Sequence, residues 1–203
     1  MKKHAIILLM AIMAFNACTK APKTIAADTA TEEPILKDYK IGEKWTWKWK
    51  RITEGKTMGE GEDFQEVVKF KNSLGFSRDG IDTTLIANEI NAKRGASYLR
   101  WPLKVGEKWV FDEDWESNDG TKGHTKQEVE VVSFEETTVD AGKFMAYKIL
   151  LKGRVTNSRG FKGEMTDTWW YAPELKTYIK HVNEDGSGLY VNELINYTSG
   201  SIK

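Results

Sequence analysis

Histidines and acidic residues are the side chains of this sequence with the greatest potential for catalysis or metal binding. The chain of 203 residues has three histidines, and two of them, His124 and His181, lie beyond the N-terminal segment. His124 falls in a cluster of turn residues and His181 in a strand with alternating polar residues, so we expect both to be exposed. No histidine pair has the helical spacing of metal ligands, and the single cysteine lies near the N-terminus.

The acidic segment 112–120 is the stretch that most resembles a cation-binding loop. An EF-hand loop needs glycine at its sixth position and glutamate at its twelfth, where this sequence has Ser117 and Gly123. A hairpin with solvated carboxylates is therefore the better interpretation. The sequence also contains no Gly-x-Ser-x-Gly motif and no phosphate-binding glycine loop after a strand. We predict no catalytic residue, no metal and no cofactor, although paired carboxylates would leave no spacing signature.

Tryptophan is unusually frequent, with eight residues in this small chain. Three of them, at positions 45, 47 and 49, alternate with polar residues, which predicts that they share one face of a strand. Such rings usually pack into a core, but several on neighbouring strands could instead line an apolar cavity or a stacking platform for sugars. Both interpretations stay open. The candidate ligand-binding residues are Trp45, Trp47, Trp49, Trp101, Trp109 and Trp169.

The N-terminus has the pattern of an exported and lipid-modified protein. Lys2 and Lys3 precede an apolar run at 5–15, which is shorter than the about 20 residues of a membrane-spanning helix and fits a signal peptide. The residues that end in Cys18 resemble the lipobox of bacterial lipoproteins, although Phe and Asn stand where Leu and a small residue are usual. The resemblance implies that the signal peptide (1–17) is removed and that Cys18 is acylated, with chains such as palmitate. An ordinary secretory signal followed by a free thiol is the alternative.

Residues 18–35 lack apolar periodicity and are predicted to be a lipidated tether. We expect a bacterial envelope protein, anchored at the periplasmic face of the outer membrane if the organism has two membranes. The 30 basic and 30 acidic residues balance, which argues against a nucleic-acid partner. The expected partners are the membrane, through the lipid anchor, and a lipid or an envelope protein.

Residues 36–203 predict a single all-β domain. Alternating and β-prone runs recur along this region, and clusters of Asn, Asp and Gly typical of hairpin turns separate them. No stretch has a helical period over twelve or more residues, and only a short helix near 88–93 is considered. We expect about eight to ten antiparallel strands in a curved sheet that closes into a barrel or sandwich, since closure protects sheet edges.

An internal repeat predicts how these strands are ordered. The segment 40–45, KIGEKW, recurs at 104–109 as KVGEKW, and EVVKF at 66–70 recurs as EVVSF at 130–134, both at an offset of 64 residues. A unit made mainly of hairpins cannot bury its own apolar face, so we expect two units to share one core. The predicted units are 39–102 and 103–173, followed by a C-terminal hairpin at 174–200.

Two segments of the C-terminal half resemble a group of uncharacterised envelope proteins that we call TapB-like, after members linked to type IV pilus assembly. Segment 138–148, TVDAGKFMAYK, is similar to their "aGxFxAxK" pattern, and segment 169–180, WWYAPELKTYIK, to "WYxP…G…VK". Leu175 or Lys176 replaces the usual glycine. The resemblance implies a secreted antiparallel β domain and little about activity. More loosely, a tethered curved sheet is similar to lipoprotein-carrier folds that bind acyl chains.

These observations favour a non-enzymatic envelope lipoprotein that binds an apolar or amphiphilic ligand or a partner protein. A structural or assembly factor for envelope machinery, with the tryptophans as plain core, is the alternative. A glycan hydrolase that uses paired carboxylates is the second alternative.

Overall fold

The computed structural model describes residues 30–93 and 98–201. The predicted signal peptide, Cys18 and most of the tether lie outside these residues. No helix in the described ranges is long and apolar enough to cross a membrane. The strands are β1 (Lys44–Thr53), β2 (Lys56–Phe70), β3 (Ser73–Arg78), β4 (Asp82–Leu85), β5 (Lys108–Glu116), β6 (Lys122–Val139), β7 (Gly142–Asn157), β8 (Lys162–Ala172), β9 (Thr177–Glu184) and β10 (Leu189–Thr198). The helices are α1 (Ile86–Lys93) and two 3-10 turns, η1 (Leu36–Asp38) and η2 (Pro173–Leu175).

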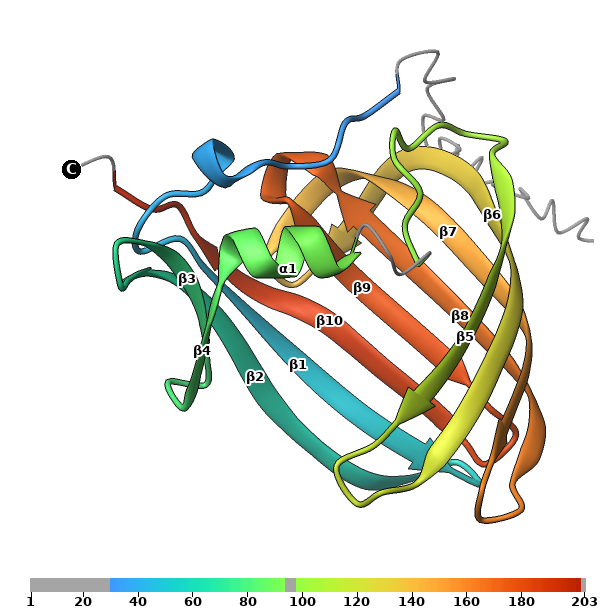
Figure 1. Cartoon of the computed structure of the whole chain (residues 1–203). Coiled ribbons are helices and arrows are strands. Elements are labelled where there is room, and N and C mark those ends of the chain that lie inside the picture. Colours follow the sequence, from blue (N-terminus) through green and yellow to red (C-terminus); the bar gives the residue numbers. More distant parts are fainter. Residues whose placement is uncertain (1–29, 94–97, 202–203) are drawn as a thin grey trace, which may run out of the picture.

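The strands form one antiparallel sheet in the order β4-β3-β2-β1-β10-β9-β8-β7-β6-β5 (Figure 1). Chain neighbours pair through hairpins, while β1 pairs with β10 and so joins the start and the end of the domain. Turn chemistry sets these hairpins: Glu54 and Gly55, between β1 and β2, both have positive φ, at 49° and 74°. Two such residues are typical of the tight turns that match the twist of an antiparallel pair.

The sheet is strongly curved but open. β4 and β5 stand at its opposite ends, and no pairing between them occurs within the described residues. The all-β, antiparallel prediction is confirmed, whereas closure into a barrel or sandwich is not. β4 has four residues and leads directly into α1, and β5 carries several charged side chains, which protect an edge without closure. The helix α1 lies across the hollow of the sheet, and the chain then continues towards β5 (Figure 1).

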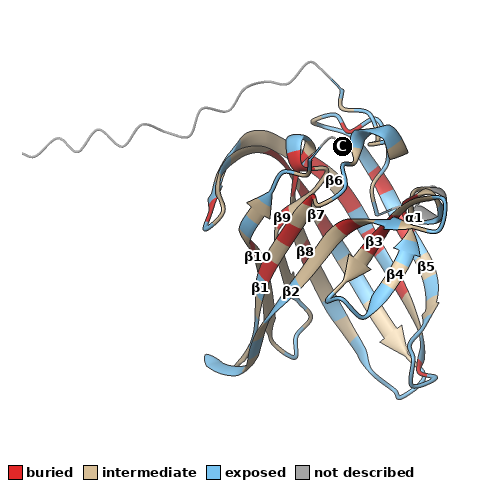
Figure 2. Ribbon diagram, turned by 90° about the vertical axis from the view of Figure 1, so that its left-hand side faces the viewer, coloured by how far each residue is buried: buried red, intermediate tan, exposed pale blue. Residues whose placement is uncertain are grey.

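The buried residues form two hydrophobic clusters, and Figure 2 shows where buried residues fall along the strands. The first cluster draws residues from β1 to β3, β6 to β10, α1 and η2, and the second lies mainly on β5 to β8. Directly paired residues share a face of a sheet, so the register can be followed across the strands. The paired residues Trp109, Val129, Leu151, Asp167, Asn183, Tyr190 and Arg51 lead from β5 to β1. Trp109 is therefore on the inner face that also holds Trp47 and Trp49, which alternate with Arg51 along β1.

The two Gly-Glu-Lys-Trp segments enter their strands through the same backbone turn. The amide of Gly42 donates to the Val67 carbonyl at 2.8 Å, and the amide of Gly106 donates to the Val131 carbonyl at 2.8 Å. Both glycines have positive φ, at 80° and 89°, a conformation that glycine adopts without steric cost. The strand pairs that follow also correspond, since Lys44 faces Glu66 and Lys108 faces Glu130.

Candidate ligand-binding cavity

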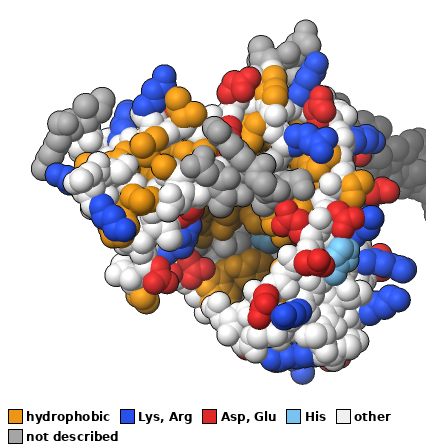
Figure 3. Space-filling model, in the orientation of Figure 1, with side chains coloured by type: hydrophobic (Ala, Val, Ile, Leu, Met, Phe, Trp, Pro, Cys, Tyr) orange, Lys and Arg blue, Asp and Glu red, His pale blue; other side chains and the backbone are white. Residues whose placement is uncertain are grey.

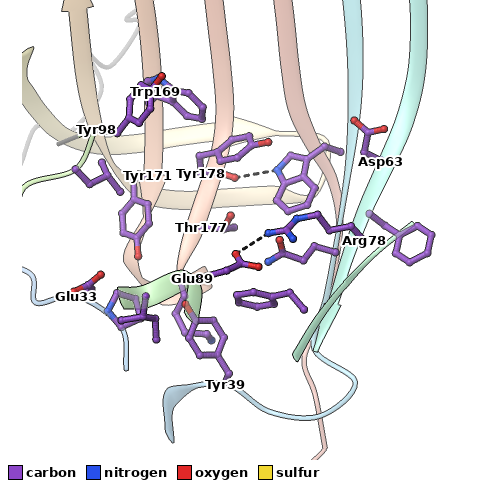
Figure 4. Close-up of a pocket in the computed structure, with 18 of the residues that line it drawn as sticks. Glu33, Tyr39, Asp63, Arg78, Glu89, Tyr98, Trp169, Tyr171, Thr177 and Tyr178 are labelled. Carbon is purple, nitrogen blue, oxygen red and sulfur yellow. Dashed lines mark hydrogen bonds and ion pairs between the residues drawn. The ribbon is translucent and has the colours of Figure 1, made fainter. Parts of the chain in front are cut away.

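A cavity of about 720 Å³ lies on the inner face of the sheet. Figure 3 shows hydrophobic side chains in the hollow, and Figure 4 shows the residues that surround it. Small-molecule sites have volumes in the same range and are mainly apolar with a few polar groups. The sheet supplies one wall, and the segments that cross the hollow supply the other.

The sheet wall is aromatic because inward positions of adjacent strands hold large rings. Trp47 of β1 and Tyr178 of β9 stack with ring centres 5.3 Å apart, and Trp169 of β8 meets Tyr178 edge-on at 4.9 Å. The Trp47 indole Nε1 donates a hydrogen bond to the backbone carbonyl of Tyr178 at 3.1 Å, which fixes its ring. These contacts hold the wall in one arrangement before any ligand enters.

The covering wall comes from α1, from the chain that follows it and from the segment before β1. Helix α1 contributes Glu89 and Ile90, and the chain after it contributes Trp101, which meets Tyr171 edge-on at 5.4 Å. The segment before β1 contributes Glu33 and its neighbours. Two backbone hydrogen bonds of 2.9 and 2.8 Å between Thr31 and Leu103 join the segment before β1 to the chain that follows α1.

Two polar atoms in the wall have no hydrogen-bond partner within the described residues. They are the hydroxyl of Tyr171 and the indole Nε1 of Trp169. Tyr171 is 5% exposed, and burial, above all other causes, raises the pKa of its hydroxyl, which therefore keeps its proton. A buried donor without a partner costs free energy, and an acceptor atom of a ligand would remove that cost. Figure 4 shows Tyr171 pointing its hydroxyl along the cavity towards Glu33.

Both basic side chains of the wall make ion pairs. Arg78 of β3 donates to Glu89 of α1 at 2.7 Å and so ties the helix to the sheet. Lys176, which follows η2, donates to the buried Glu43 at 2.6 Å. The Arg78–Glu89 pair is drawn in Figure 4. Asp63 of β2 also lines the cavity and makes no ion pair with a described residue.

A buried polar network borders this cavity, and sequence reasoning missed it. Asp167, 3% exposed, accepts hydrogen bonds from Gln127 at 2.8 Å and Asn183 at 2.9 Å. It also contacts His181 Nε2 at 2.8 Å, and His181 stacks on Trp169 with ring centres 3.7 Å apart. The prediction of an exposed His181 is wrong, since its side chain is 13% exposed. The period-two pattern that puts His181 on the same face as the buried Ile179 was the available signal.

His124 and the acidic segment lie on the β5–β6 hairpin, away from the cavity wall. The His124 side chain is 45% exposed, as predicted, and its ring contacts Asp112 at 3.2 Å and Asp114 at 2.8 Å. A hydrogen bond from Lys126 is the main cause that lowers the pKa of Asp112. Within the described ranges, no group of three His, Cys, Asp or Glu side chains could hold a metal ion.

The structure separates the six candidate tryptophans into two sets. Trp47, Trp101 and Trp169 line the cavity. Trp45 and Trp109 are buried in the first and second core cluster, and Trp49 stacks on Tyr190 at 6.4 Å, so these three are not among the described residues of the wall. The wall also holds Tyr171 and Tyr178, which the sequence analysis did not select.

No protein-family model and no curated protein matches this chain. Two solved structures do, each over 84% of this chain and 100% of its own length. One, from Parabacteroides distasonis, is described as a lipoprotein and has a TM-score of 0.50 at 10% identity. The other, from Bacteroides fragilis, is described as an exported protein with a YmcC-like fold and has a TM-score of 0.43 at 11% identity. The likeness to the first shows a similar fold.

Proposed function

We propose that this protein is a lipid-anchored envelope protein that binds an apolar or amphiphilic ligand in its cavity without catalysing a reaction. The observation that carries the proposal is the cavity of about 720 Å³ between an aromatic sheet wall and a covering helix. Each methylene that leaves water for such a wall contributes about 0.8 kcal/mol, so an alkyl chain would bind with useful affinity. The unpartnered donors of Tyr171 and Trp169 would receive an acceptor atom of the ligand.

The membrane attachment rests on the sequence. The apolar run and Cys18 favour export and acylation, with palmitate among the expected chains and the periplasmic face of an outer membrane as the expected site. The Parabacteroides distasonis protein, described as a lipoprotein, supports the same assignment. The cavity wall begins at Glu33, so a tether of about 15 residues would keep the cavity within roughly 50 Å of the acyl group.

We also infer that the two halves of the sheet descend from one duplicated hairpin unit. The matching turns at Gly42 and Gly106, and the matching strand registers at an offset of 64 residues, support this origin. The resemblance of the C-terminal half to TapB-like envelope proteins agrees with an extracytoplasmic β domain.

A partner protein is the second candidate for the occupant, because β5, at the end of the sheet, pairs on only one side within residues 30–93 and 98–201. An extended segment of an assembly partner could add to such an edge as a further strand. This binding mode would leave the cavity unchanged, so the two candidates respond differently to substitutions in the wall.

The deciding experiment compares two variants of the full chain expressed in a bacterial envelope. Thr177 lines the cavity, and Thr177→Trp should fill part of it, whereas Val110→Trp puts the same ring at an exposed position on β5. Each protein is extracted in polymer discs without detergent, and its bound molecules are identified by mass spectrometry. We expect an amphiphile with the wild type and with Val110→Trp that is depleted with Thr177→Trp. Equal amounts in all three samples would contradict the proposal.

A further inference from the structure

The cations of the cavity wall are already neutralised. The Arg78 guanidinium donates to Glu89 at 2.7 Å and to the Thr84 hydroxyl at 3.2 Å. The Lys176 ammonium donates at 2.6 Å to Glu43, which is 1% exposed. An anionic ligand would have to take one of these cations from its carboxylate, and breaking the largely buried Lys176–Glu43 pair is costly.

One carboxylate of the wall, that of Asp63, has no cation beside it among the described residues. Asp63 accepts no hydrogen bond and makes no ion pair within the described residues, yet it lines the cavity. It lies directly opposite Trp47 in the β1–β2 pairing and therefore shares the inner face with that ring. Figure 4 shows Asp63 on the β2 side of the cavity. Burial and then the nearby Tyr190 are the larger causes that raise the pKa of Tyr178, and the charge of Asp63 is the next. This carboxylate therefore acts on the aromatic wall.

The aromatic rings of the sheet wall are also without a cation over them. Lysines and arginines lie over six rings of the described chain, but none lies over Trp47, Trp169 or Tyr178. The face of an aromatic ring is negative and attracts ammonium groups, most strongly for Trp. An unpaired carboxylate and aromatic rings without a cation over them thus line the same apolar cavity.

We infer that the ligand of this cavity is a cationic amphiphile, whose ammonium group lies between Asp63 and the rings of Trp47 and Tyr178 and whose apolar part fills the remaining space. This inference rests on the proposed function and specifies the class of its ligand. The selectivity is for positive over negative and neutral head groups on the same alkyl chain. Ionic strength should weaken the selectivity, because Asp63 is exposed to solvent.

The test uses three probes with one ten-carbon chain: decyltrimethylammonium, decanoate and decyl glucoside, each below its micelle concentration. The full chain carries Cys18→Ser, which removes the acylation site, and binding is measured by calorimetry at low and high salt. We expect decyltrimethylammonium to bind about tenfold more tightly than the other two at low salt. Asp63→Asn should weaken the binding of this probe about fivefold and leave decyl glucoside unchanged.

The matched control is Glu62→Gln, which removes the same charge one residue away. Glu62 is opposite Lys48 on the outer face of the β1–β2 pair, so this variant should bind like the wild type. Decanoate or decyl glucoside binding as tightly as the ammonium probe would overturn the inference and leave the proposed function standing. An equal effect of Glu62→Gln and Asp63→Asn would also overturn it. Binding of none of the probes would contradict both, and circular dichroism of each variant shows whether the sheet is intact.

Discussion

The two Gly-Glu-Lys-Trp turns have the same backbone but different surroundings. In the first, Glu43 is 1% exposed and its carboxylate accepts hydrogen bonds from Lys176 at 2.6 Å and from the Tyr197 hydroxyl at 2.7 Å. In the second, Glu107 is exposed to solvent. The difference follows from position in the sheet, because β1 is paired on both sides, by β2 and β10, whereas β5 is an edge strand.

This comparison shows how one sequence motif acquires two roles. The turn itself is local, since it depends on a glycine with positive φ and on hydrogen bonds to the next strand. The contacts of Glu43 are not local, because its partners Lys176 and Tyr197 come from the residue after η2 and from β10, which the chain places beside β1 but not beside β5. The first turn therefore fixes the cavity-lining Lys176, whereas the second turn leads into the edge strand β5.

The largest expected difference between the two turns is in stability. Glu43→Ala leaves Lys176 buried without its carboxylate, and we expect a loss of about 3 kcal/mol in the free energy of unfolding. Glu107→Ala is the matched control and should change it by less than about 0.5 kcal/mol. Urea unfolding of both variants measures these changes. Equal midpoints would show that the Glu43 network does not stabilise the first turn.

A second contrast concerns the glycines that correspond in the two hairpins, Gly59 and Gly123. A Cβ atom on Gly123 would lie 2.1 Å from Cζ2 of Trp115, whereas one on Gly59 would lie 3.5 Å from Cζ3 of Trp49. We expect Gly123→Ala to destabilise the protein by about 2 kcal/mol through overpacking and Gly59→Ala to have little effect.

Thermal unfolding of the two alanine variants tests this contrast. In a Trp115→Leu background, Gly123→Ala should lose most of its effect, because the clashing ring is gone. A full effect in that background would mean that the indole is not the cause.

The smallest expected effect on stability comes from the turns that connect the two strands of each hairpin. The β1–β2 turn is tight, whereas the β5–β6 turn is longer and is held by Asp119. Hydrogen bonds, first from Ser117 and then from Thr121, lower the pKa of Asp119 to about 2, and Arg159 contributes. The folded state thus favours the carboxylate, so the contribution of Asp119 to stability is present above the ordinary carboxyl pKa and is lost as pH falls towards about 2.

Carbon-detected NMR titration of Asp119 checks this prediction. Its midpoint should lie near 2 in the wild type and rise in Ser117→Ala, because the largest cause of the shift is removed. An unchanged midpoint in this variant would assign the shift to another group.

The strands were predictable because their signals are local. The alternating Trp45, Trp47 and Trp49 gave β1, and the Asn, Asp and Gly clusters gave most of the hairpin turns. Helix α1 was only weakly indicated, since it has eight residues and no long apolar period. The open edges could not be read from the sequence, because the choice between closure and charged edges depends on how β4 and β5 meet in space.

The cavity was only half visible in the sequence for the same reason. The period of two placed Trp47 on an inner face, but it could not show that Trp47, which is buried in the same core cluster as Trp45, would also border a hollow. The covering residues, such as Trp101 and Glu89, come from irregular chain and from α1, whose path over the sheet is a tertiary property. The environment of His181 depends in the same way on its neighbours across three strands.

The measurement that tests the central claim most directly is photocrosslinking with a decyltrimethylammonium probe that carries a diazirine at the end of its chain. The full chain with Cys18→Ser is irradiated with the probe below its micelle concentration, and the adducts are mapped by mass spectrometry. We predict adducts on the cavity wall, at residues such as Trp101, Trp169 and Tyr171, that an excess of unlabelled probe removes. Adducts confined to the outer face of the sheet or to the β5 edge would contradict the account.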